Sequence, residues 1–216
     1  TQNTFLKYLD CDTNNLQNID LTQNMLLQTL SCSYNYMYTL DVSQNVSLVS
    51  LSCIYNFLSD LDVSNNLKLV YLNCGYNTLV GLDVSQNTVL NELYCQHNYL
   101  RCLNVSNGNN MNFVGLTSYF NNLLTCIQVD DENWATANWN NTYGAIPGVS
   151  FYFDAQNTFS NYCNDACSGV LTSINELPIN FELKVFPNPF SSSTNIEIPN
   201  KGDESYTLVI YDILGN

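Results

Sequence analysis

Apolar residues recur with a period of 21 positions through the first half of the chain. Each period has a leucine, two residues, a second leucine, one residue and then a cysteine, with mostly polar residues in the gaps. Because the second leucine and the cysteine alternate with polar positions, each period predicts a short strand with one inward face. Equal periods predict coils that stack, so that these strands form a parallel sheet. The cysteine column consists of Cys11, Cys32, Cys53, Cys74 and Cys95.

An asparagine follows each column cysteine by three positions, and the second half of most periods reads Leu-Asp-Val-Ser-x-Asn. A buried amide at a turn can bond backbone groups that a narrow coil leaves unpaired. One period buries about seven apolar side chains, too few to offset the entropy of ordering it, so we expect the coils to fold only as a stack. The asparagine column consists of Asn14, Asn35, Asn56, Asn77 and Asn98.

The pattern L-x-x-L-x-C-x-x-N-x-L resembles the short cysteine-bearing leucine-rich repeat of internalin-like bacterial surface proteins, over residues 5 to about 126. The resemblance implies a mainly β, right-handed leucine-rich-repeat solenoid with short parallel strands, which we place at residues 1–124. The column cysteines are then buried, free and inert thiols, because burial raises the thiol pKa. Metal binding and redox chemistry are the alternatives.

The repeat becomes irregular after Cys95. We expect Met111, Val114 and Leu116 to keep the register, with Leu116 in the place of the cysteine and Tyr119 in that of the turn asparagine.

After Cys126 the sequence no longer follows the repeat and reads IQVDDENWATANWNN. Here Asp130 or Asp131 is placed to cap a short helix that bears Trp134 and Trp139. The run VSFYFDAQNTF alternates as a strand does. Since the last repeat needs a cover for its core, we expect residues 125–167 to form a C-terminal cap.

Four further cysteines lie outside the column: Cys102, Cys126, Cys163 and Cys167. From the residues alone, three disulfide connectivities are possible, and a four-cysteine zinc site is an alternative that lacks the usual C-x-x-C pairs. The run TCIQVDD-x-x-W-A-T-A-N-W resembles the C-terminal cap of secreted repeat proteins of the Bacteroidota. That resemblance implies a bond between Cys126 and Cys163, which would leave Cys102 for Cys167.

Residues 168–180 have the composition of a linker, and 181–216 contain three strand-like runs. The sequence VFPNPF, Val185 to Phe190, with the runs after it, is similar to the opening half of the type IX secretion sorting domain. The resemblance implies a partial β-sandwich that outer-membrane secretion machinery recognises. A generic accessory β-domain is the alternative.

Charge narrows the range of partners. The chain has 5 Lys+Arg against 19 Asp+Glu and a net charge of -14, which disfavours nucleic acid and anionic lipid. No apolar run approaches the roughly 18 residues of a membrane span. We expect a monomer that is secreted or attached to the outer cell surface.

The residue types argue against an enzyme. The sequence has 1 histidine, His97, so a triad or a multi-histidine metal centre cannot form within it. Asp10 and Asp12 share a strand face, but an open strand surface offers no cleft for paired carboxylates. The aspartates of the Leu-Asp-Val-Ser segment favour backbone capping, with calcium as the alternative and no other cofactor expected. That column is Asp20, Asp41, Asp62 and Asp83.

Two outward surfaces are candidates for binding. Outward strand positions carry Tyr8, Asp10, Tyr71, Asn73 and Tyr94, and the turn before the asparagine carries Tyr34, Tyr55, Tyr76 and His97, flanked by Tyr36, Phe57 and Tyr99. Aromatic rings with polar tips suit contact with proteins and with sugars, although stacked rings could also only stabilise the turns. The sequence thus favours a non-catalytic recognition protein that binds proteins or glycans. An accessory region of a larger secreted enzyme and a passive spacer are the alternatives.

Overall fold

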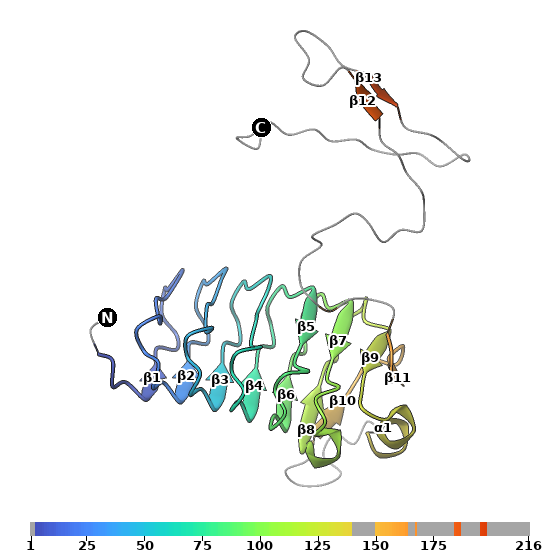
Figure 1. Cartoon of the computed structure of the whole chain (residues 1–216), viewed down its shortest axis with the longest axis horizontal. Coiled ribbons are helices and arrows are strands. Elements are labelled where there is room, and N and C mark those ends of the chain that lie inside the picture. Colours follow the sequence, from blue (N-terminus) through green and yellow to red (C-terminus); the bar gives the residue numbers. More distant parts are fainter. Residues whose placement is uncertain (1–2, 140–149, 164–166, 168–183, 187–194, 198–216) are drawn as a thin grey trace. The chain divides into compact units, whose positions relative to one another are not determined.

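Stacked coils form most of the molecule. The computed structural model describes residues 3–139, 150–163, 167, 184–186 and 195–197. The chain divides into two compact units, Thr1–Gly169 and Val170–Asn216. The first unit is a mainly β solenoid with two rows of short parallel strands (Figure 1). This architecture confirms the fold class that the 21-residue period predicts.

The first row is a seven-stranded sheet in which each coil contributes one strand in register. Leu30 lies between Leu9 and Leu51, and the same pairing continues through Leu72 to Leu93. Equal periods therefore place equivalent side chains over one another. The strands, in spatial order, are β1 (Tyr8–Asp10), β2 (Thr29–Ser31), β3 (Ser50–Ser52), β4 (Tyr71–Asn73), β6 (Glu92–Tyr94), β8 (Gly115–Thr117) and β10 (Ser150–Tyr152).

A second parallel sheet, which the sequence analysis did not predict, lies on the return half of the later coils. It has four strands, ordered β11-β9-β7-β5, and pairs Gly81 with Cys102 and Leu82 with Leu103. Its members are β5 (Gly81–Asp83), β7 (Cys102–Asn104), β9 (Cys126–Gln128) and β11 (Thr158–Ser160).

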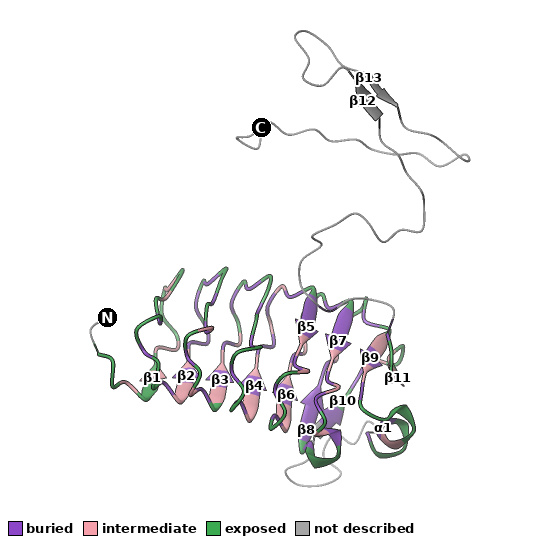
Figure 2. Ribbon diagram, viewed as in Figure 1, coloured by how far each residue is buried: buried purple, intermediate pink, exposed green. Residues whose placement is uncertain are grey.

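The cysteine column lies inside the coils. Cys32, Cys53, Cys74 and Cys95 are fully buried, whereas Cys11 in the first coil is half-buried. All five are free, as predicted, and burial raises the pKa of each thiol, for Cys95 to about 12. The four inner thiols are therefore protonated and inaccessible at neutral pH. Cys11 is less protected, because the first strand is the most exposed of the row (Figure 2).

The asparagine column ties neighbouring coils together. The Asn56 amide donates to the carbonyl oxygens of Cys32 and Cys53 at 3.0 and 3.1 Å, and its Oδ1 accepts the Met37 N–H at 3.1 Å. Asn35, Asn77 and Asn98 are buried in the same way, whereas Asn14 is exposed in the first coil. The predicted role of this column is confirmed for the inner coils.

A second file of asparagines is also buried, in the Leu-Asp-Val-Ser-x-Asn half of the coil. Asn45, Asn66 and Asn87 have no exposed surface, and each donates both amide hydrogens to carbonyl oxygens of the preceding coil. Both turns of the coil are thus held by an amide ladder.

The predicted register of the sixth coil is wrong by two residues. Leu116 pairs with Leu93, so it is the strand leucine, and Asn121 is the turn asparagine that donates to the Cys95 carbonyl at 3.1 Å. The cysteine position is therefore held by Ser118, and Met111 is exposed. The shift arises because the turn before β8 contains an additional short 3-10 helix, η1 (Asn110–Asn112).

The segment predicted as a cap adds strands to both sheets, since β9, β10 and β11 fall within it. It also contains α1 (Glu132–Asn138), whose N-cap Asp131 accepts the N–H groups of Asn133 and Trp134 at 2.9 and 3.0 Å. Trp139 ends the helix and is buried against Phe113 and Phe151. These rings cover the last coils of the core.

Two disulfides fasten this end of the solenoid, Cys102 to Cys167 and Cys126 to Cys163. The bond between Cys126 and Cys163 is the one that the resemblance implied, and the other pairs the two cysteines that this bond leaves; together they replace the zinc alternative. A side chain at Gly81 would meet the Cys167 carbonyl oxygen at 3.2 Å, so this glycine leaves room for the first bond.

In the second unit, β12 (Lys184–Phe186) pairs antiparallel with β13 (Asn195–Glu197). The predicted linker 168–180 and most of the predicted sorting module lie outside the described residues. Among the helices in the described ranges, none has the length and apolar content needed to span a membrane.

Candidate recognition surfaces

The outward side chains of the first sheet form the first surface, here called the strand face. In the centre, the rings of Tyr71 and Tyr94 lie 5.7 Å apart, and the Asn73 amide donates to the Tyr71 hydroxyl at 3.3 Å. The Tyr94 hydroxyl donates to Glu92 Oε2 at 3.0 Å, and burial, aided by Glu92, raises the Tyr94 pKa to about 12. Three of the predicted binding residues, Tyr71, Asn73 and Tyr94, are thus brought together.

The other two, Tyr8 and Asp10, lie three coils away on β1. Asp10 Oδ1 accepts the Asp12 N–H at 3.1 Å, and both Asp12 oxygens accept the Ser31 hydroxyl at 2.8 Å. Asp12 also accepts the Ser33 N–H at 2.6 Å. Asp12 therefore holds the first two coils together and Asp10 caps the backbone of its own coil, which is not the arrangement of a catalytic acid and base.

The turn residues form the second surface, here called the aromatic file: Tyr34, Tyr55, Tyr76, His97 and Phe120. The ring centroids of Tyr55 lie 4.7 Å from Tyr34 and 4.1 Å from Tyr76, with interplanar angles of 18° and 17°. His97 continues the stack at 4.1 Å from Tyr76 and 4.3 Å from Phe120. Phe120 was not predicted as a member, because the register predicted for the sixth coil was two residues out.

All five members of the file have left-handed backbones, with φ of 54° or 55°. For a bulky residue this conformation is an outlier that costs about 1 to 2 kcal/mol. A stacked pair of rings returns about 0.5 to 1.5 kcal/mol beyond the apolar area that it buries, so stacking and burial together oppose the strain. Glycine or asparagine would adopt the same backbone without that penalty. Thr13, the equivalent residue of the first coil, has a φ of 56° without a ring, so the coil imposes this backbone whatever the side chain.

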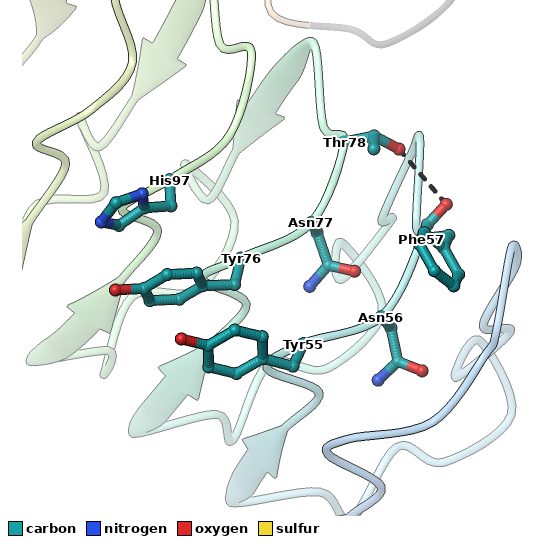
Figure 3. Close-up of a pocket in the computed structure, with 7 residues that line it drawn as sticks. All are labelled: Tyr55, Asn56, Phe57, Tyr76, Asn77, Thr78 and His97. Atoms are coloured by element: carbon teal, nitrogen blue, oxygen red, sulfur yellow. Dashed lines mark hydrogen bonds between the residues drawn. The ribbon is translucent and has the colours of Figure 1, made fainter. Parts of the chain in front are cut away.

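A groove of about 350 Å³ lies beside the aromatic file. Figure 3 shows the rings of Tyr55, Tyr76 and His97 stacked on one side and Phe57 and Thr78 on the other. The remaining lining residues are Asn56 and Asn77 of the asparagine column. None of these seven lining residues is an acid, a lysine or an arginine.

His97 adds no charge to this groove at neutral pH. Burial between the neighbouring rings lowers the pKa of its imidazole, and the charge of Asp154 opposes the shift only in part. The neutral imidazole stacks as an aromatic ring, as the sequence analysis expected.

The aspartate column caps the backbone as predicted. Asp41, Asp62 and Asp83 each accept the N–H of the serine two residues later, at 2.9, 2.9 and 2.8 Å. Hydrogen bonds from the same serine or threonine lower the pKa of Asp41 and of Asp20. Within the described ranges, no three His, Cys, Asp or Glu side chains gather in the way that metal ligands do.

Comparison with known proteins bears on the fold. No family model matches the chain, and no curated protein matches it. Among solved structures, the chain is similar to the functional domain of InlJ from Listeria monocytogenes, which includes a cysteine ladder. The TM-score is 0.53 and the sequence identity 25%, and the match covers 73% of this chain and 35% of that one. It is also similar to a leucine-rich-repeat protein of Leptospira interrogans, with a TM-score of 0.50 and 20% identity over 72% of this chain and 38% of that one.

The chain thus spans little more than a third of the length of these neighbours. Both neighbours share the solenoid fold, and the InlJ domain also includes a cysteine ladder. The first unit is a leucine-rich-repeat solenoid with a cysteine ladder.

Proposed function

We propose that this chain is a non-catalytic recognition region of an extracellular protein, and that it binds a protein or a glycan through the strand face. The composition of that face supports the proposal. In the seven described strands, the outward positions carry hydroxyl, amide, carboxylate or aromatic groups, with Gly115 as the exception. Hydrogen-bonding groups held in register on a rigid sheet suit recognition of a macromolecule.

The two disulfides support an extracellular setting, because such bonds persist in oxidising compartments. We further propose that the second unit directs export by type IX secretion. The VFPNPF sequence and the antiparallel pairing of β12 with β13 support this assignment. A chain truncated after residue 180 should then accumulate inside cells that carry the secretion system, and normal export of that chain would contradict the assignment.

Binding by the strand face can be tested with a labelled full chain on arrays of glycans and of extracellular proteins. Replacing Tyr71 and Tyr94 with alanine should weaken the strongest signal at least tenfold, because both rings and two hydroxyl groups are lost. The matched control is Tyr162→Ala, which removes a 75% exposed tyrosine away from this sheet. Equal signals from the wild type and the double variant would count against use of this face.

The accessory-region alternative concerns the whole protein. The solved neighbours are nearly three times as long as the part that this chain matches. Further domains beside the solenoid are therefore compatible with a recognition role for this chain. The reading frame before Thr1 would show whether a catalytic domain accompanies the solenoid.

A further inference from the structure

The groove beside the aromatic file differs in chemistry from the strand face. One wall consists of the stacked rings of Tyr55, Tyr76 and His97, and the other of Phe57 and Thr78. A volume of about 350 Å³ is within the range of sites that take a small ligand or a few side chains. Tyr55 and Phe57 are 40% and 42% exposed, so their rings leave apolar surface open to a partner.

Sugar binding by this groove is disfavoured. A sugar stacks on the open face of an aromatic ring, but Tyr55 and Tyr76 are each covered on both faces by neighbours at 4.1 to 4.7 Å. The amides of Asn56 and Asn77, which could otherwise read sugar hydroxyls, are committed to cysteine carbonyls of the ladder.

The backbone of the groove is also largely committed. The Phe57 N–H donates to the Met37 carbonyl and the Thr78 N–H to the Leu58 carbonyl, both at 2.9 Å. The Thr78 hydroxyl donates to the Leu58 carbonyl at 3.0 Å. The phenol hydroxyls of Tyr55 and Tyr76 interact with each other, and this bond adds to the burial that raises the Tyr55 pKa. A matching ligand therefore presents mainly apolar groups to the walls of the groove.

Charge adds a further requirement. The seven lining residues are uncharged at neutral pH, so the groove itself takes apolar groups. The whole chain carries a net charge of -14 with only 5 Lys+Arg, so it attracts cationic partners and repels anionic ones. An extended polypeptide that alternates aliphatic and basic side chains meets both requirements. Aromatic-lined grooves recognise extended peptides in other protein modules.

We propose that this groove is a docking site for a cationic, extended polypeptide segment of a partner protein, whose aliphatic side chains enter between the aromatic file and Phe57. This site goes beyond the strand face and involves different residues, so either can fail without the other.

The test uses the full chain and three labelled synthetic peptides of equal length: one of lysine, proline and leucine, one with serine in place of leucine, and one with glutamate in place of lysine. A neutral oligosaccharide is the fourth probe. Fluorescence anisotropy gives the affinity for each peptide, and calorimetry gives it for the sugar. We expect the lysine-leucine peptide to bind at least tenfold more tightly than the others, and more weakly at high salt.

The variant is Tyr55→Asn with Tyr76→Asn, because asparagine tolerates the left-handed backbone and the fold should survive. It should reduce the affinity for the lysine-leucine peptide at least tenfold with no fall in melting temperature, while Tyr71→Ala with Tyr94→Ala should leave that affinity unchanged. Tyr55→Phe with Tyr76→Phe, which keeps the rings, should retain most of it.

Three outcomes would overturn the proposal. The first is equal binding of the leucine and serine peptides. The second is a preference for the oligosaccharide that the asparagine variant abolishes. The third is the absence of peptide binding, and a lower melting temperature of the asparagine variant would then assign the file a purely structural role.

Discussion

Removing one amide of the buried ladder should destabilise the solenoid by an amount that the structure allows us to calculate. In Asn56→Ala, the carbonyl oxygens of Cys32 and Cys53 each lose one donor but keep another, from Asn35 and Asn77 respectively. Each such loss costs about 0.5 to 1.5 kcal/mol. The buried Met37 N–H, however, loses its acceptor, which costs about 1 to 3 kcal/mol. Together these terms give about 2 to 6 kcal/mol.

Urea unfolding with the disulfides intact measures this difference, and the slope with urea should not change. The matched control is Asn14→Ala, because Asn14 holds the same place in the ladder but is exposed, so that water can replace its bonds to Cys11 and Asp12. It should change the free energy of unfolding by about 0.5 kcal/mol or less. Equal effects of the two substitutions would refute the reasoning, as would a change below about 1 kcal/mol for Asn56→Ala.

Three further predictions concern titration, covalent bonds and metal. The pKa of His97, the single histidine, should lie below the ordinary value of about 6.5 when measured by NMR. Because the unfolded chain then binds the proton more tightly, the free energy of unfolding should fall as the pH drops from about 6.5 through the folded pKa. His97→Phe should remove this dependence. Replacing Cys126 and Cys163 with serine should cost about 4 kcal/mol, because the bond closes a loop with a sequence separation of 37, and unchanged urea unfolding would argue against that effect. A chelator should leave the melting temperature unchanged, because Asp41 and its equivalents already bond backbone N–H groups, and a fall would favour the calcium alternative.

The period of the sequence was sufficient to predict the first sheet, the buried thiols and the first amide ladder. Each follows from one residue type that recurs every 21 residues, such as the cysteine at Cys53 or the asparagine at Asn56. Coils of equal length stack with equivalent residues over one another. The second sheet could not be predicted in this way, because the return half of the coil has the same sequence pattern in coils that form a strand there and in coils that do not. Asp62 and Asp83 hold equivalent places, yet only Asp83 lies in a strand.

The candidate site was predictable in its residues but not in its geometry. The spacing placed Tyr34, Tyr55, Tyr76 and His97 in one column, whereas nothing in the sequence indicated their left-handed backbones, since such positions usually hold glycine or asparagine. Phe120 was missed because the turn before β8 is longer, and an insertion of this kind changes the register without changing the apolar pattern.

Thiol labelling followed by mass spectrometry tests most directly that equivalent side chains of successive coils lie over one another in a dry interior. In the native chain, we expect a maleimide to label Cys11, which is half-buried, and to leave Cys32, Cys53, Cys74 and Cys95 unmodified. In urea without reductant, all five column cysteines should react and the four disulfide-bonded ones should not. Rapid labelling of the four inner cysteines in the native chain would contradict the account.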